Sequence, residues 1–134
     1  MTRKEERELA FTLIFEKIFN EDLTVCEIID NAIEARLIEE NPYACSLAQL
    51  VYDNRAEIDS QIIKYAVGWS VTRLPKVTLA VLRLAFGEIL FVPSVPRGVT
   101  INEAVELAKK FSSQEDASFI NGILGKYVRE NEEK

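Results

Sequence analysis

Histidine is absent from this chain of 134 residues, and cysteine, glycine and proline are scarce. Without histidine, the chain lacks the usual general base of enzymes and the commonest metal ligand. Neither a glycine-rich phosphate loop nor a dinucleotide-binding motif occurs. Adjacent carboxylates such as Glu39 and Glu40 fall at expected helix ends, where solvated surface charge explains them. We therefore expect no catalytic activity, no metal site and no cofactor.

The two cysteines, Cys26 and Cys45, are too few for a disulfide framework and have no histidine with which to form a zinc site. We expect both to be small buried apolar residues. No apolar run approaches the roughly 18 residues that a membrane-spanning helix needs, and the charged amino terminus leads into no signal sequence. The simplest expectation is a cytoplasmic protein without membrane contact.

The formal net charge of the chain is −6, from 16 basic and 22 acidic residues. A negative surplus of this size excludes a protein that coats nucleic acid through its overall charge. Any contact with nucleic acid must therefore be local, whereas a basic protein partner would be attracted.

Apolar residues recur at helical spacing along most of the chain, and no segment alternates as a strand does. This pattern predicts an all-α fold of seven helices in one domain, residues 1–134. The helix expected from Pro75 through Val92 is apolar around most of its circumference and belongs at the centre of the bundle. Within it, Arg83 and Glu88 would be costly as lone buried charges, so each should be paired. Gly87 indicates close approach by a neighbouring helix.

Local signals predict where several helices begin. The spacing predicts a first helix over residues 5–19. Thr24 and Thr100 are each followed three residues later by a glutamate, which is the pattern of a capping box, and we expect helices to start there. Pro42 suits the first turn of a helix and should begin the third one.

Basic residues stand at the beginning of the first helix. Arg3 and Arg7 lie on the continuation of its apolar stripe, with Lys4 beside them. Because arginines cannot continue a dry core, this end should project past the bundle and present its cations to solvent or to a ligand. Cations one turn apart can bridge successive phosphates of a nucleic acid. The alternative is a charged first turn held by pairs with the neighbouring glutamates.

The last third of the chain adds two polar features. Lys109 and Lys110 end the helix that Thr100 is expected to open, where they could contact RNA or simply complement the helix dipole. We expect Asn121 to cap or bridge backbone groups at a helix crossing, with Gly122 permitting the approach.

Short motifs follow one another along the chain: Ile58-Asp59, Trp69, Arg73-Leu74, Val81-Leu82-Arg83-Leu84-Ala85 with Glu88, Val95-Pro96, Ile101-Asn102-Glu103-Ala104-Val105-Glu106-Leu107-Ala108-Lys109 and Phe119-Ile120-Asn121-Gly122-Ile123-Leu124. In order and spacing they closely resemble the NusB family of bacterial transcription antitermination factors, over essentially the whole chain. The resemblance implies an all-helical fold of two packed halves of three to four helices, without enzymatic activity.

The resemblance also implies partners and contact residues. The partner is NusE, a protein of the small ribosomal subunit, and the heterodimer binds boxA RNA within the RNA polymerase antitermination complex on ribosomal RNA operons. The family's basic RNA-binding segment falls on Arg3, Lys4 and Arg7, here diluted by glutamates. An aromatic partner contact falls on Phe15. A partner contact that is often acidic falls on Thr78, where that ion pair cannot form.

Two other functions stay open from the sequence. One is a helical adaptor that binds proteins but no RNA, which the diluted basic segment favours. The other is a relative of the NusB-like domain of ribosomal RNA cytosine methyltransferases, which the absence of a cofactor-binding module before Lys134 disfavours. The sequence also does not decide between a monomer and a homodimer, or whether RNA binds without NusE.

Overall fold

The computed structural model describes residues 1–132, and these form helices and loops with no strand. The elements in order are α1 (Arg3–Phe19), α2 (Val25–Glu34), α3 (Pro42–Asp53), α4 (Arg55–Tyr65), the 3-10 helix η1 (Val71–Arg73), α5 (Lys76–Phe91), α6 (Arg97–Phe111) and α7 (Gln114–Glu130). The predicted all-α fold with seven α-helices is confirmed. Within these residues, no helix combines the length and apolar character needed to cross a bilayer.

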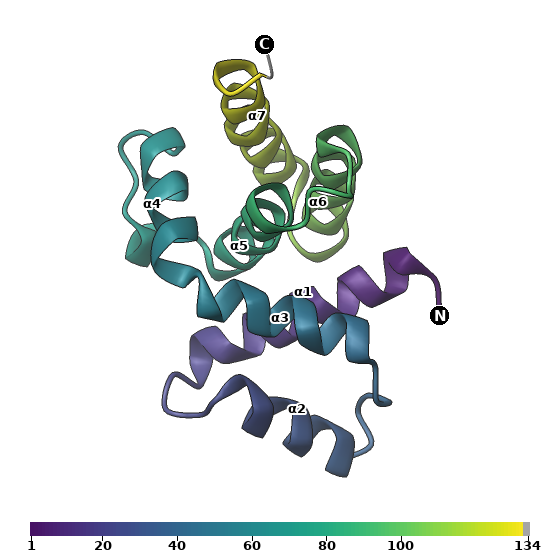
Figure 1. Ribbon diagram of the computed structural model, residues 1–134. Helices are drawn as coiled ribbons and strands as arrows, with labels where there is room; N and C mark the ends of the chain where they lie inside the picture. Colours follow the sequence, from purple (N-terminus) through teal and green to yellow (C-terminus); the bar gives the residue numbers. More distant parts are fainter. Residues whose placement is uncertain (133–134) are drawn as a thin grey trace.

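The helices pack as two halves around α5. The first half contains α1, α2 and α3, and the second contains α4 to α7 (Figure 1). Helix α5 contacts α1 and α3 on one side and α4, α6 and α7 on the other. Every residue of α5 from Thr78 to Glu88 is buried, so the prediction of a central apolar helix is confirmed.

Gly87 lies where α3 and α4 pack against α5. A Cβ atom at this position would lie 2.8 Å from Cγ2 of Val51 and 3.6 Å from Cδ1 of Ile58. The first distance is below van der Waals contact, so the absence of a side chain is what lets α3 approach. The close approach predicted at Gly87 is confirmed.

Two of the predicted helix starts are confirmed. The Thr24 hydroxyl accepts a hydrogen bond from the Glu27 amide at 3.0 Å, and the Glu27 carboxylate accepts one from the Thr24 amide at 2.9 Å. Pro42 occupies the first turn of α3, as predicted. Helix α1 begins at Arg3 rather than residue 5, because Thr2 and Glu5 form a further capping box that the sequence reading missed.

The capping box predicted at Thr100 is wrong. Helix α6 begins at Arg97, after Pro96, so Thr100 lies within the helix and is only 2% exposed. Proline favours extended backbone before a helix and cannot continue one, which explains the earlier start. The Thr100 hydroxyl instead donates a hydrogen bond to the buried carboxylate of Glu88 at 2.9 Å.

The prediction that both cysteines are buried is also wrong. Cys26 on α2 is exposed and Cys45 on α3 is partly exposed. Both line a surface groove between these two helices, and Cys45 also packs against the edge of the core. Burial of the part that is covered raises the pKa of the Cys45 thiol.

Candidate nucleic-acid interface

A groove of about 320 Å³ lies between the amino-terminal end of α1 and the carboxyl-terminal half of α6. Its lining residues are mostly charged: Lys4, Arg7, Glu8, Glu103, Glu106, Leu107, Lys109 and Lys110. Both basic segments predicted from the sequence therefore meet in one place. They are joined by Lys110, whose ammonium group donates to the Glu8 carboxylate at 2.8 Å across 102 positions of sequence.

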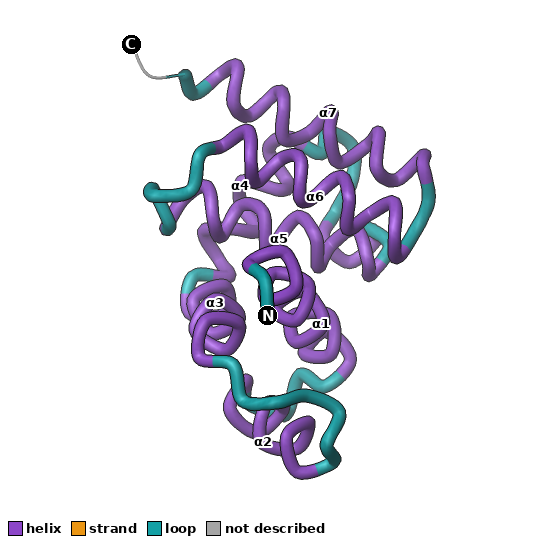
Figure 2. The backbone as a smooth tube through the Cα atoms, turned by 90° about the vertical axis from the view of Figure 1, so that its right-hand side faces the viewer, coloured by secondary structure: helices purple, strands orange, loops and turns teal. Residues whose placement is uncertain are grey.

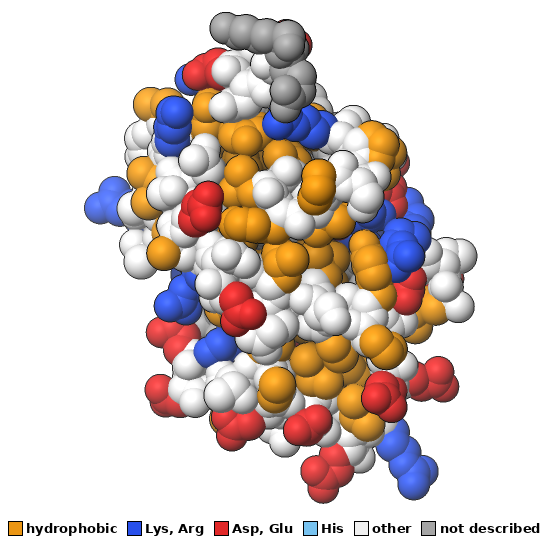
Figure 3. All heavy atoms as spheres, in the orientation of Figure 1, with side chains coloured by type: hydrophobic (Ala, Val, Ile, Leu, Met, Phe, Trp, Pro, Cys, Tyr) orange, Lys and Arg blue, Asp and Glu red, His pale blue; other side chains and the backbone are white. Residues whose placement is uncertain are grey.

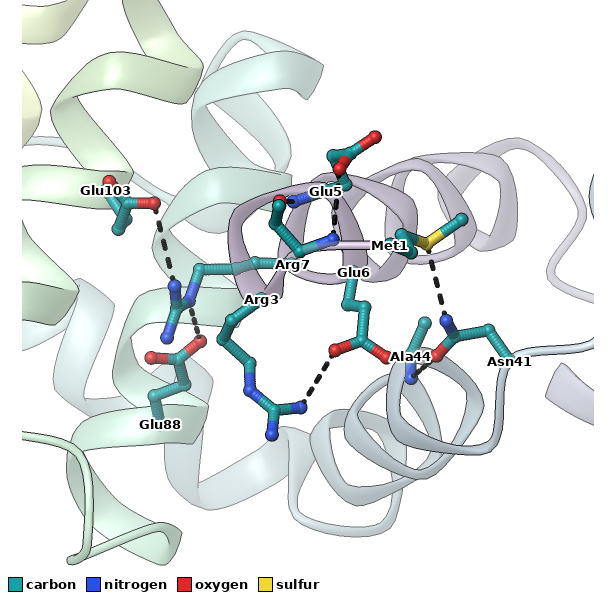
Figure 4. A network of polar contacts seen from close by, with 10 residues as sticks. Met1, Arg3, Glu5, Glu6, Arg7, Asn41, Ala44, Glu88 and Glu103 are labelled. Carbon is teal, nitrogen blue, oxygen red and sulfur yellow. Dashed lines mark hydrogen bonds and ion pairs between the residues drawn. The ribbon is translucent and has the colours of Figure 1, made fainter.

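Arg7 does not project into solvent, and the prediction that it does is wrong. The residue is only 5% exposed. Its Nε donates a hydrogen bond to Oε2 of Glu88 at 2.6 Å, and its Nη1 lies 3.6 Å from Oε1 of Glu103. Figure 4 shows the Arg7 side chain extending from α1 toward both carboxylates. The helical pattern of α1 could not reveal this pairing, because Glu88 is 81 positions away in the sequence.

Glu88 is the buried centre of a hydrogen-bond network that joins three helices. Its side chain is fully buried on α5 and accepts hydrogen bonds from Arg7 on α1 and Thr100 on α6. Burial alone would lower the pKa of Arg7, but the hydrogen bond and charge of Glu88 outweigh it, so the pKa is raised. Arg7 is therefore held in its charged form, and the prediction that Glu88 is paired is confirmed.

Arg3 and Lys4 both remain exposed, and of the two only Lys4 lines the groove. Their side chains are 56% and 64% exposed. Arg3 donates a hydrogen bond to Glu6 at 3.0 Å, and its guanidinium lies 3.6 Å from the centre of the Tyr43 ring. Lys4 lies 3.8 Å from a carboxylate oxygen of Glu103. The alternative of local pairing thus holds for Arg3, but exposed pairs of this kind are weak and leave both cations accessible.

Lys109 and Lys110 are both exposed at the end of α6. Figure 3 shows basic side chains gathered over the amino-terminal end of α1, whereas acidic side chains are frequent over α2. The cations of the groove nevertheless alternate with the carboxylates of Glu8, Glu103 and Glu106. Local positive charge is present, but it is partly neutralised within the chain.

An aromatic row follows the edge of α1 and includes Phe15, the predicted partner contact. The Phe15 ring lies 6.0 Å from the Phe11 ring and 5.0 Å from the Phe19 ring, measured between centroids. Phe111 of α6 extends the row, 5.1 Å from Phe11. Phe19 is 59% exposed and Phe111 is 40% exposed, so the row presents apolar surface to solvent. The spacing of four residues on α1 could have predicted most of it.

Thr78 does not lie on the surface, which contradicts its assignment as a partner contact. Its side chain is fully buried in α5, and its hydroxyl has no hydrogen-bond partner among residues 1–132. Neighbouring helices cover this helix on several sides, so no partner can reach Thr78 in the described arrangement.

The sequence is similar to a known family along nearly its full length. Residues 4–129 match the family model described as the NusB family. The transcription antitermination protein NusB of Acetivibrio thermocellus is 44% identical over 131 residues, which cover 96% of this chain and 90% of the relative. The NusB of Alkaliphilus oremlandii is 40% identical over 131 residues, covering 97% and 95%.

Solved structures agree with the sequence match. A structure of T. maritima NusB has a TM-score of 0.83 and 31% identity, covering 98% of this chain and 93% of that one. A crystal structure of antitermination factors NusB and NusE in complex with double-stranded RNA has a TM-score of 0.83 and 26% identity, covering 98% of this chain and 100% of that one. The helices, their packing and the matched residues lead to one conclusion: this chain belongs to the NusB family.

Proposed function

We propose that this chain pairs with NusE and that the pair binds boxA RNA in transcripts of ribosomal RNA operons, as a non-catalytic part of the RNA polymerase antitermination complex. The observation that carries the proposal is the groove in which cations from α1 and α6 meet. The family is one of antitermination factors, and a related structure holds NusB, NusE and RNA together.

The RNA contacts that we propose are Arg3, Lys4, Lys109 and Lys110. All four are exposed, and they come from α1 and α6, so they can contact phosphates at more than one point of a strand. Arg7 supports this surface from within, because its guanidinium is occupied by Glu88. Its role is to hold the end of α1 in place rather than to bind phosphate.

The charge of this chain explains why RNA binding should require NusE. The carboxylates of Glu8, Glu103 and Glu106 line the same groove, and the chain as a whole carries a net charge of −6. Both oppose a polyanion, so the lone subunit should bind RNA weakly. A basic partner adds positive charge and is attracted to this acidic protein.

The first prediction concerns the cations of the groove. Replacing both Lys4 and Lys109 with alanine should weaken binding of boxA RNA by the NusE complex, because two phosphate contacts are lost. For single-stranded RNA, the slope of log affinity against log salt should become shallower by about 1.4, or about 0.7 per contact. Fluorescence anisotropy at several salt concentrations measures both quantities.

Lys64→Ala is the matched control for this experiment. Lys64 is an exposed lysine of α4 and is not part of the groove. The control should bind RNA like the unmodified chain. If Lys4→Ala/Lys109→Ala keeps the same affinity and salt slope as Lys64→Ala, the groove is not the RNA site. If the unmodified chain binds NusE but the resulting pair binds no RNA, the protein is an adaptor for proteins only.

The aromatic row on α1 is the surface that we propose for NusE. Exposed aromatic rings are strong anchors in protein interfaces because they bury a large apolar area at small entropic cost. Phe15 is held between Phe11 and Phe19, so its ring is already fixed before a partner binds. This preorganisation favours binding.

The second prediction tests this surface. Phe15→Ala should lower the affinity for NusE by about 1–3 kcal/mol, as loss of an aromatic anchor does. Isothermal titration of NusE into the variant measures the change. Leu37→Ala, which removes an apolar side chain that is 78% exposed outside the row, is the control and should not alter the titration. Identical binding curves for both variants would remove Phe15 from the interface.

A further inference from the structure

A second groove, of about 380 Å³, lies between α6 and α7 and shares Lys109 with the first groove. Apart from Lys109, its lining consists of small, apolar and uncharged polar residues, among them Ile101, Asn102, Val105, Gln114 and Asn121. No carboxylate belongs to this lining among the described residues, although acidic residues outnumber basic ones in the chain. Lys109 therefore gives the second groove a positive charge.

The groove follows from the sequence pattern of two adjacent helices. On α6, Asn102, Val105 and Lys109 are separated by three and four residues, so they share one helix face. On α7, Gln114 and Asn121 are seven residues apart and also share a face. Figure 2 shows α6 and α7 lying alongside each other, and a short loop joins them. Each stripe spans about 10 Å, given a rise of about 1.5 Å per residue.

The side chains of Asn102 and Asn121 contribute little to holding the helices together. The prediction that Asn121 caps or bridges backbone groups is not met: its side chain is exposed, and the side-chain hydrogen bonds of α7 within residues 1–132 involve other residues. Gly122 is not a point of close approach either, since a Cβ there would meet no heavy atom within 4 Å. Asn102 is also exposed, and its amide reaches only a carboxylate oxygen of Glu103, at 3.5 Å. Their amide groups are thus available to a ligand.

We infer that the groove between α6 and α7 reads bases of single-stranded RNA, with Asn102 and Asn121 as specificity-determining residues. This inference rests on the proposed function, because the strand would enter from the first groove at Lys109. Each amide offers a donor and an acceptor, which match the edges of unpaired bases. The apolar side chains of Ile101 and Val105 offer a surface for base faces. Phosphate contacts in the first groove cannot distinguish sequences, whereas base contacts can.

The test compares two RNA oligonucleotides, one with the boxA element and one with the same bases scrambled, bound to the NusE complex of Asn102→Ala/Asn121→Ala. The ratio of the two affinities should fall by about fivefold or more, because contacts to base edges are lost. Affinity for the scrambled RNA and the salt dependence should stay unchanged, because the cations remain. Alanine favours helix, so the variant should keep its fold, and circular dichroism checks this.

Asn31→Ala is the matched control, because Asn31 is an exposed helical asparagine on α2, outside both grooves. It should keep the full affinity ratio. An unchanged ratio in Asn102→Ala/Asn121→Ala would overturn the inference and leave the proposed function standing. An equal loss for both RNAs would also overturn it, since the groove would then contribute no base selection. If the unmodified complex binds neither RNA, the proposed function fails and the inference fails with it.

Discussion

Arg7→Ala is expected to lower the free energy of unfolding by about 3–5 kcal/mol, because it leaves the Glu88 carboxylate buried without its cation. Glu88 is fully buried, and Thr100 would remain its only described hydrogen-bond donor. A loss of this size is a large part of the roughly 5–15 kcal/mol that stabilises a typical domain. Urea denaturation followed by circular dichroism measures it.

Arg3→Ala is the control for this prediction. Arg3 lies one turn before Arg7 on α1, but its side chain is 56% exposed and its pair with Glu6 is on the surface. Its loss should change the free energy of unfolding by less than about 1 kcal/mol. Similar small losses for both variants would show that the buried ion pair of Arg7 and Glu88 contributes little to stability. RNA-binding experiments should therefore leave Arg7 intact, since its removal changes stability and binding together.

Asp59→Ala is expected to lower the free energy of unfolding by about 2–3 kcal/mol, because it leaves a second buried cation, Arg83, without its carboxylate partner. Two parallel hydrogen bonds join the pair, from Nε to Oδ1 and from Nη2 to Oδ2, each 2.9 Å long. Arg83 is only 7% exposed, and Tyr52 accepts a weaker bond from it at 3.3 Å. The loss is smaller than for Arg7 because the Asp59 side chain is 19% exposed and water can reach it.

A double variant separates the ion pair from general effects of the substitution. Asp59→Ala/Arg83→Met removes both charges and keeps apolar volume at the site, so it should recover part of the stability lost in Asp59→Ala. Asp30→Ala, on an exposed position of α2, should have almost no effect. If Asp59→Ala is no less stable than Asp30→Ala, the bidentate pair does not hold α4 to α5.

The basic residues that the sequence proposed as RNA contacts differ in their burial in the structure. The sequence identified Arg3, Lys4, Lys109 and Lys110 as candidate RNA contacts, and all four are exposed. It also assigned Arg7 to this group, although Arg7 is buried. Helical spacing shows which residues share a face, but it does not show which other helix covers that face. The pairing of Arg7 with the buried Glu88 carboxylate of α5 could therefore not be predicted from the sequence.

The two predicted capping boxes likewise differ in outcome, because one depends on local residues alone and the other meets a tertiary contact. Thr24 caps α2 because nothing but its own helix competes for its hydroxyl. Thr100 has the same local pattern, but Pro96 starts α6 earlier and Glu88 takes the hydroxyl. Motifs that depend on four consecutive residues are reliable only where no buried group elsewhere needs the same atoms.

The amino-acid sequence was enough for the helical class, the central apolar helix, the close approach at Gly87 and the family, because each depends on local periodicity or on the order of residues. Only the tertiary structure decided that Arg7 is buried, that Thr78 is inaccessible and that the two basic segments form one groove. Those outcomes depend on contacts between α1, α5 and α6, which are far apart in the chain and brought together by burial of their apolar faces.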